Sequence, residues 1–285
     1  MNYVCQRGQA NPCQFGVSAD GKTMDTVRQG TNHIRDQAQS IPWMWFPELL
    51  LEDVWHHPQA YATFAKYVPR NSSVLEIGFG SGRILTQMAK RRECRCVGVD
   101  IDRGAFPSLA FFSKHEQIAA SGILGSGFSL PFKDGAFDVV YSEGVIEHFS
   151  PEDSRLLLAE HVRACRTGGL VIVSVPNRFA VFHSLTKAIL GRRFLFFPER
   201  SLSVFACSRA LREAGTKIIA CDGFAFGCQF YDFKVFVLDP RLPARWRKRL
   251  LAPLHWMRAI GLYHFDLPWL NALFGFQVLV VGIKQ

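Results

Sequence analysis

Short apolar runs alternate with segments of helical periodicity through much of the chain. Strands of about four to seven residues that alternate with helices are typical of an α/β domain with a mostly parallel sheet. The expected strands are 74–77, 94–100, 122–125, 137–141, 170–175, 217–221 and 276–283. We therefore predict a doubly wound, Rossmann-like sheet.

Three glycines interrupt this pattern where the first strand ends. Gly78, Gly80 and Gly82 alternate with other residues, and an amphipathic helical pattern begins at Arg83. Glycine allows left-handed backbone and close approach to a ligand, and a helix N-terminus presents N–H groups to an anion or polar group. The dinucleotide fingerprint G-x-G-x-x-G does not fit, because its last glycine would fall on Arg83 or Leu85.

The second strand ends in an acid, Asp100, 18 residues after Gly82. Doubly wound folds place a carboxylate at about this distance to accept hydrogen bonds from ribose hydroxyls. A helix-capping acid is the alternative interpretation. The strand before Asp100 favours the ribose site.

Three motifs together resemble one family. They are acidic-x-Gly-x-Gly-x-Gly at 76–82, L-P-F-x-D-x-x-F-D-x-V at 130–140, and a Gly-Gly, strand, Pro-Asn series at 168–177. In this order they resemble the class I S-adenosylmethionine-dependent methyltransferases, in the type 11 small-molecule branch. The resemblance covers 74–177 and implies a seven-stranded sheet whose last strand is antiparallel.

The resemblance also implies a binding site for S-adenosylmethionine at the carboxyl ends of the strands. The residues it assigns to this cofactor are Glu76, Gly78, Gly80, Gly82, Asp100, Ile101, Ser126, Gly127, Phe128 and Ser142. Ser126 departs from the pattern, since the family usually has an acid there that reaches the adenine amino group. A hydroxyl accepts a weaker hydrogen bond than a carboxylate does.

His148 and Glu147 follow the fourth strand and are the candidate catalytic residues. Methyl transfer depends mainly on alignment of the reacting atoms, and a base is needed only when the acceptor must lose a proton. Histidine suits that task near neutral pH. Packing against the sheet remains the alternative role for both. We expect a small, largely apolar or aromatic acceptor, with oxygen preferred over nitrogen or carbon.

The net charge of +9 does not indicate a nucleic-acid substrate. Residues 134–160 hold seven acids and one arginine or lysine, whereas 239–258 hold six basic residues and one acid. The segment after the fourth strand also lacks N/D-P-P-Y and a nucleophilic cysteine, the marks of nucleic-acid methyltransferases. Eight cysteines without a C-x-x-C pair predict a reduced, cytoplasmic protein without a metal site.

The chain outside the matched region divides by composition. We expect a flexible arm at 1–40 and one methyltransferase domain at 41–285. Within that domain we expect cap helices at 41–70, the core at 71–177, a substrate cap at 178–207 and an insertion at 225–272.

The insertion leaves a second function open. Apolar residues around Trp246 recur at helical spacing beside a basic run, so 241–258 is either a packed helix with a solvated cationic face or a peripheral membrane contact. A catalytically silent methyltransferase-fold module would use this basic, aromatic insertion to bind a partner or a membrane surface. The sequence predicts no oligomeric state.

Overall fold

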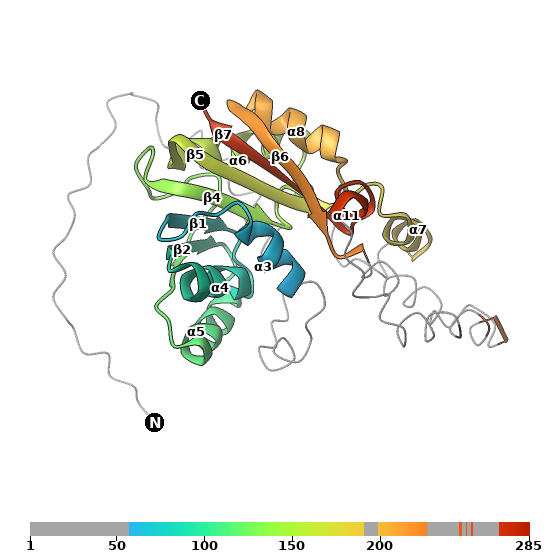
Figure 1. The fold of residues 1–285 in the computed structure, drawn as a ribbon, viewed down its shortest axis with the longest axis horizontal. Coiled ribbons are helices and arrows are strands. Elements are labelled where there is room, and N and C mark those ends of the chain that lie inside the picture. Colours follow the sequence, from blue (N-terminus) through green and yellow to red (C-terminus); the bar gives the residue numbers. More distant parts are fainter. Residues whose placement is uncertain (1–56, 191–198, 227–244, 247–248, 250–251, 253–267) are drawn as a thin grey trace. The chain divides into compact units, whose positions relative to one another are not determined.

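The strands form one seven-stranded sheet in the order β3-β2-β1-β4-β5-β7-β6 (Figure 1). The computed structural model describes residues 57–190, 199–226, 245–246, 249, 252 and 268–285. The strands are β1 Ser73–Ile77, β2 Arg95–Asp100, β3 Ser121–Leu124, β4 Phe137–Glu143, β5 Cys165–Pro176, β6 Thr216–Phe224 and β7 Gln277–Lys284. β7 runs antiparallel between β5 and β6, and the other neighbouring pairs are parallel. The predicted fold class is confirmed.

Helices cover both faces of the sheet (Figure 1). One face packs against α3 (His57–Ala65), α4 (Arg83–Arg92) and α5 (Ala105–Glu116), and the other against α6 (Pro151–Ala164) and α8 (Val204–Glu213). A 3₁₀ turn, η1 (Ile146–His148), follows β4. Two more helices, α7 (Val181–Leu190) and α11 (Pro268–Phe274), complete the described elements. Among the described residues, no helix is long and apolar enough to cross a bilayer.

Alternation along each strand decides which helices a side chain meets. On β7, Leu279 and Val281 belong to the apolar core under α3 and α4, whereas Val278 and Val280 belong to the core under α6 and α8. All four are fully buried, as expected for a strand covered on both faces. We call these two faces the α3 face and the α6 face.

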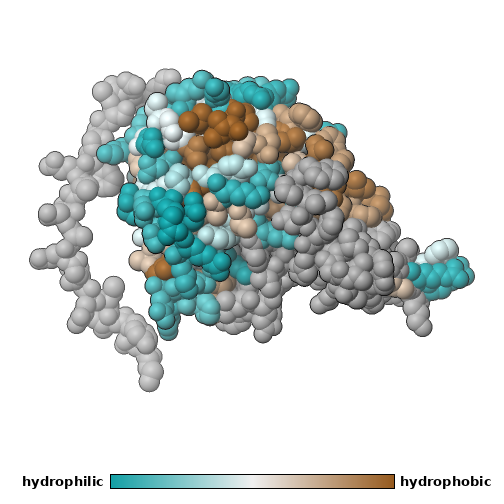
Figure 2. Space-filling model, in the orientation of Figure 1, coloured by the Kyte–Doolittle hydropathy of each residue, from teal (hydrophilic) through white to brown (hydrophobic). Residues whose placement is uncertain are grey.

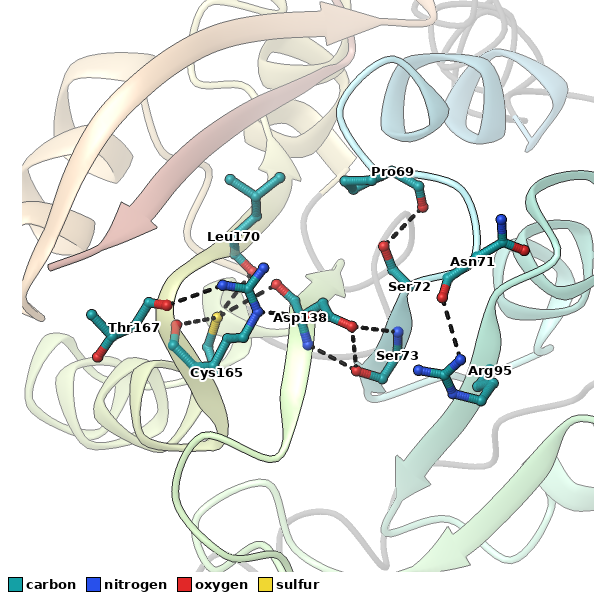
Figure 3. A network of polar contacts seen from close by, with 10 residues as sticks. Pro69, Asn71, Ser72, Ser73, Arg95, Asp138, Cys165, Thr167 and Leu170 are labelled. Atoms are coloured by element: carbon teal, nitrogen blue, oxygen red, sulfur yellow. Dashed lines mark hydrogen bonds and ion pairs between the residues drawn. The ribbon is translucent and has the colours of Figure 1, made fainter.

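An ion-pair network joins the amino-terminal ends of three strands (Figure 3). Oδ2 of Asp138 on β4 accepts hydrogen bonds from the backbone N–H (2.8 Å) and the hydroxyl (2.6 Å) of Ser73 on β1. Oδ1 accepts from the guanidinium of Arg166 on β5, at 2.7 Å. Asp138 of the L-P-F-x-D-x-x-F-D-x-V motif therefore has a structural role at the sheet edge opposite the glycine loop.

Two element boundaries differ from the sequence prediction. The helix expected to reach Gly168-Gly169 ends at Ala164, because Cys165 already adopts an extended conformation and pairs with Phe137 on β4. Gly169 then lies so close to β4 that an added Cβ would come within 2.7 Å of the Asp138 carbonyl oxygen. The helix expected from Ser208 begins at Val204 instead.

The start of α8 has a local cause. The hydroxyl of Ser203 accepts a hydrogen bond from the backbone N–H of Ala206, at 3.2 Å, and caps the first turn.

Several predicted segments lie partly or wholly outside the described residues. The arm 1–40 is outside them, and the cap segment 41–70 is described only from His57 onward. Most of the insertion 225–272 is also outside, although its end forms α11, which packs against β6. The proposed membrane contact at 241–258 is described at only four residues.

The helix α7 occupies the predicted substrate cap and exposes apolar side chains. Val181, Leu185 and Ile189 recur every four residues and are 44–61% exposed. Figure 2 shows hydrophobic residues at the surface near α7, whereas the surface over α4 and α5 is mainly hydrophilic.

Candidate active site at the carboxyl ends of the strands

The turn after β1 has the backbone that the glycines predicted. Gly78, Gly80 and Gly82 have φ angles of +70°, +51° and +73°. An added Cβ at Gly78 would come within 2.6 Å of a Val145 methyl group, and one at Gly82 within 2.6 Å of Leu109. The turn therefore requires glycine for conformation and for space. Gly82 is also the N-cap of α4 and has no side chain to bond the first-turn N–H groups.

Asp100 connects the glycine turn with the end of β2. Its Oδ2 accepts from the Gly80 N–H and its Oδ1 from the Asp102 N–H, both at 2.8 Å. Burial raises the pKa of this carboxyl, although these two hydrogen bonds oppose the rise. A carboxylate can accept about four hydrogen bonds, so Asp100 has acceptor capacity left for ribose hydroxyls. Ile101 follows directly and is 37% exposed.

Glu76 lies on the α3 face of β1 and is buried. Its Oε2 accepts a 2.8 Å hydrogen bond from the hydroxyl of Tyr141 on β4, the residue paired with it across the strands. Burial raises the pKa of Glu76 well above its usual value, and the Tyr141 hydrogen bond opposes that rise. Glu76, Asp100 and Tyr141 therefore lie close together on one face of the sheet.

The loop after β3 carries three predicted cofactor residues. The Ser126 hydroxyl accepts a 3.2 Å hydrogen bond from the Phe128 N–H. Gly127 lies so close to the core that an added Cβ would meet Ile77 and Leu157 at 2.8 Å. The Phe128 ring packs edge-on against Phe149, with centroids 5.0 Å apart. This loop therefore adjoins η1 and offers a hydroxyl and an aromatic surface.

Ser142 is not brought together with the other predicted cofactor side chains. It follows Tyr141 on β4, so its side chain lies on the α6 face. There its hydroxyl is 3.0 Å from Nε2 of His161 on α6, whose Nδ1 is 2.7 Å from the Leu157 carbonyl oxygen. A carbonyl only accepts, so Nδ1 carries the proton and the Ser142 hydroxyl donates to Nε2. Burial lowers the pKa of His161 to about 4 and keeps it neutral.

Glu147 and His148 lie in η1, immediately after the end of β4. The Glu147 side chain is 2% exposed, and its Oε1 is 4.0 Å from Nε2 of His148, which is 19% exposed. Burial raises the pKa of the Glu147 carboxyl well above its usual value, and the neighbouring Glu199 and Glu143 carboxylates raise it further. The two predicted catalytic residues are therefore adjacent at the carboxyl edge of the sheet.

The structure adds polar residues that the sequence did not identify. Glu143 ends β4, and burial raises its pKa to about 7. Glu199 accepts hydrogen bonds on Oε1 from Lys187 (2.9 Å) and Ser201 (3.0 Å), and lies 3.2 Å from Nε2 of His183. Burial opposes ionisation of Glu199, but the hydrogen bonds and charges of His183 and Lys187 lower its pKa to about 2. The four-residue spacing of His183 and Lys187 on one helix face was the available sequence signal.

The described residues hold no group of three or more histidine, cysteine, aspartate or glutamate side chains placed to bind a metal ion. The glycine turn and the Asp100 carboxylate fit a nucleoside instead, since one gives close backbone approach and the other accepts from hydroxyls. Carboxyls continue along the same edge from the buried Glu76 through the partly buried Glu143 to the buried Glu147. A cationic ligand there would favour the ionised form of these carboxyls.

Comparison with known proteins agrees with this geometry. A family model described as a methyltransferase domain, of the type 11 branch, matches residues 75–173. An uncharacterized methyltransferase of Mycobacterium sp. (strain JLS) is 38% identical over 106 residues, which are 37% of this chain and 39% of the relative. Ajmaline N-methyltransferase of Rauvolfia serpentina is 30% identical over 107 residues, which are 37% of this chain and 35% of the relative.

The matched stretch therefore spans less than half of each of these relatives. Among solved structures, a chain from the complex of the Haloferax volcanii Trm112 methyltransferase activator superposes with a TM-score of 0.56. It is 19% identical, and the superposition covers 84% of this chain and 93% of that chain. Residues 75–173 thus match the methyltransferase domain of the type 11 branch, and the superposition shows that the chain shares its fold with that solved structure.

Proposed function

We propose that the protein transfers the methyl group of S-adenosylmethionine to a small, largely apolar or aromatic acceptor. The observation that carries this proposal is the glycine turn joined to Asp100, because the Gly80 N–H binds the carboxylate that would accept from the ribose. Bound there, the cofactor would supply an electrophilic methyl group on a positively charged sulfur. The chain's own task is to align an acceptor with that group.

The cofactor's adenosine part would contact the residues around the turn. Asp100 would accept from the ribose hydroxyls, and the Ser126–Phe128 loop would contact the adenine. Glu76, buried on β1, and Glu143, partly buried at the end of β4, would lower the energy of the cofactor's positive charges. The Ser142 hydroxyl is hydrogen-bonded to His161, so Ser142 would contact the cofactor through its backbone.

The acceptor would bind beside η1 and α7. Apolar surface there comes from the Phe128–Phe149 ring pair. We propose that His148 takes the proton that an acceptor oxygen or nitrogen must lose. The prediction of an oxygen acceptor rests on His148 alone, and the N-methyltransferase relative from Rauvolfia shows that the matched region also occurs in an enzyme named for a nitrogen acceptor.

Calorimetric titration with S-adenosylhomocysteine tests the cofactor site. We expect a dissociation constant well below about 1 mM, the affinity that corresponds to about 4 kcal/mol. Failure to bind below millimolar concentration contradicts the enzyme function and favours the silent binding module. That alternative has the Ser126 replacement in its favour, and it depends on the insertion, most of which lies outside the described residues.

His148→Asn tests the proposed base once a substrate is identified. Loss of a general base lowers turnover by about 10²–10⁴-fold, while affinity for S-adenosylhomocysteine stays unchanged. Normal turnover of the variant would reduce His148 to a packing role. Cytoplasmic location and membrane contact through 241–258 stay predictions.

A further inference from the structure

The carboxyl group of Glu147 has a buried oxygen without a partner. The side chain is 2% exposed, and among the residues that the structure describes none hydrogen-bonds to Oε2. Its other oxygen is 4.0 Å from the His148 ring, beyond hydrogen-bond distance. Buried polar atoms in native proteins nearly always have a partner, so an orphaned oxygen calls for an explanation. A ligand that donates a hydrogen bond provides one.

Other carboxyls surround Glu147 and bias the site toward positive charge. Glu143 lies four residues earlier at the end of β4. The segment containing Glu199 is held beside η1, because the Arg200 N–H donates to the Glu147 carbonyl oxygen at 2.8 Å. The Arg200 guanidinium extends this attachment by donating to the Phe149 carbonyl oxygen at 2.8 Å. Both carboxylates interact unfavourably with an ionised Glu147.

Each of the neighbouring cations already has partners: Lys187 and His183 pair with Glu199, and the Arg200 guanidinium donates to the Phe149 carbonyl oxygen and the Ser154 hydroxyl. Lys187 Nζ lies 2.9 Å from Glu199 and 3.1 Å from the Ser201 hydroxyl, and His183 lies 3.2 Å from Glu199. Lys187 has only a minor effect on Glu147. The charge on Glu199 is thus compensated within the protein, whereas Glu147 has a neighbouring histidine but no hydrogen-bonded cation among the described residues.

The cofactor charges do not account for Glu147. On the cofactor side, Glu76 on β1 interacts with the carboxyls of Asp100 on β2 and Glu143 on β4. Glu147 lies past the end of β4, on the side of the Glu199 segment, and interacts with Glu143 and Glu199. In the proposed enzyme this is the acceptor side.

We propose that Glu147 binds the protonated nitrogen of the acceptor, so that the substrate class is a primary or secondary amine attached to an apolar or aromatic body. This inference rests on the proposed methyltransferase function and deepens it. The ammonium donates to Oε2 of Glu147, and the Phe128–Phe149 ring pair offers apolar surface nearby.

The proton balance assigns separate roles to the two residues of η1. Glu147 holds the ammonium, and His148 takes one proton from it, so that the nitrogen regains its lone pair. The nitrogen then bonds to the methyl carbon as the carbon–sulfur bond breaks and its electron pair stays on sulfur. The positive charge lost from sulfur appears on the methylated nitrogen, and the proton leaves through the His148 imidazolium.

Paired ligands that differ only in the reacting group test the inference by binding. The full chain is saturated with S-adenosylhomocysteine and titrated with phenethylamine and with phenethyl alcohol. We expect the amine to bind at least about tenfold tighter, because a buried carboxylate that gains a cation recovers much of its desolvation cost. Glu147→Gln should reduce this preference to about twofold or less, while Glu152→Gln, an exposed glutamate of α6, should leave it intact.

The results separate this inference from the proposed function. Three outcomes overturn the amine assignment alone, provided that S-adenosylhomocysteine binds normally. The wild-type protein shows no preference for the amine, the preference is unchanged in Glu147→Gln, or neither phenethylamine nor phenethyl alcohol binds. Failure to bind S-adenosylhomocysteine overturns the proposed function. If Glu147→Gln does not fold, the wild-type protein is incubated with labelled donor and a host extract instead. Mass spectrometry of the product must then show the new methyl group on nitrogen. A methyl group on oxygen or carbon overturns the inference.

Discussion

The hydroxyl of Tyr141 donates a 2.8 Å hydrogen bond to Glu76, and both side chains are buried on the α3 face of the sheet. The bond joins β1 to β4 where the glycine turn begins, and it opposes the rise that burial causes in the pKa of Glu76. Tyr141 also packs against Phe64 of α3, with ring centroids 5.0 Å apart. One side chain thus orients a predicted cofactor residue and fixes a covering helix.

Tyr141→Phe should keep the packing and remove only the hydrogen bond. Because a buried carboxyl then loses its donor, we expect the free energy of unfolding to fall by about 1–3 kcal/mol, with weaker binding of S-adenosylhomocysteine. Urea denaturation and calorimetry measure both effects. Tyr67→Phe is the matched control, since that hydroxyl binds Asp222 on β6, away from the turn. Unchanged cofactor affinity in Tyr141→Phe would show that Glu76 does not need this orientation.

Gly78→Ala should destabilise the protein for two reasons, left-handed φ and contact with Val145. Gly135→Ala separates them, because Gly135 has φ +67° but an added Cβ there would meet its nearest atom at an ordinary 3.5 Å. We expect about 1–2 kcal/mol from backbone strain in both variants and a further loss at Gly78 only. Val145→Ala in the Gly78→Ala background should recover part of that further loss. Equal destabilisation of the two single variants would contradict the close packing of the turn.

Asp100→Asn should weaken binding of S-adenosylhomocysteine by about 1–3 kcal/mol, because charge-assisted hydrogen bonds to the ribose are lost. Asparagine retains an acceptor for one of the two backbone N–H groups, so stability should change less than in Asp100→Ala. Calorimetry gives the affinity and thermal melting gives the stability. Wild-type affinity in the asparagine variant would place the ribose elsewhere.

Stability should fall as pH rises because of Glu143. Burial raises the pKa of Glu143 to about 7 in the folded state, above the usual value near 4.5. The folded protein then holds a proton that the unfolded chain has lost, and this stabilisation is present below about pH 4.5 and lost as pH rises through 7. A shift of this size corresponds to about 3 kcal/mol. Urea denaturation at pH 5 and pH 8 should show a smaller pH dependence in Glu143→Gln than in wild type, and equal dependence would argue against ionisation of Glu143.

Asp138 should have the opposite pH dependence. The hydrogen bonds from Ser73 and Arg166 lower its pKa to about 2 (Figure 3). Its stabilisation is present above the unfolded pKa, near 4, and is lost as pH falls toward 2. Asp138→Asn should therefore cost about 1–3 kcal/mol at pH 7 and progressively less below pH 4. Its cofactor affinity should match that of wild type, since Asp138 lies at the opposite edge of the sheet, and the exposed Asp134→Asn serves as control.

Much of the fold and half of the site follow from local features of the sequence. Three features depend only on a short stretch of backbone: the periodicity of the strands, the three glycines and the acid that ends β2. They can be recognised in the sequence without knowledge of what packs against them. The left-handed backbone at Gly78, Gly80 and Gly82 accordingly agrees with expectation. The end of α6 was misjudged because Cys165 is extended by pairing with Phe137, a contact between distant residues.

Contacts between side chains that are distant in sequence could not be predicted in this way. Alternation along β4 places Tyr141 beside Glu76 and turns the Ser142 hydroxyl toward His161, a division that depends on strand register. The Glu199 segment reaches η1 because Arg200 binds its backbone from more than 50 positions away in the sequence. The glycine turn could be predicted from the sequence because its conformational requirements are local. Among the described residues Oε2 of Glu147 has no partner, an arrangement that depends on packing and charge from separate elements that only the folded chain brings together.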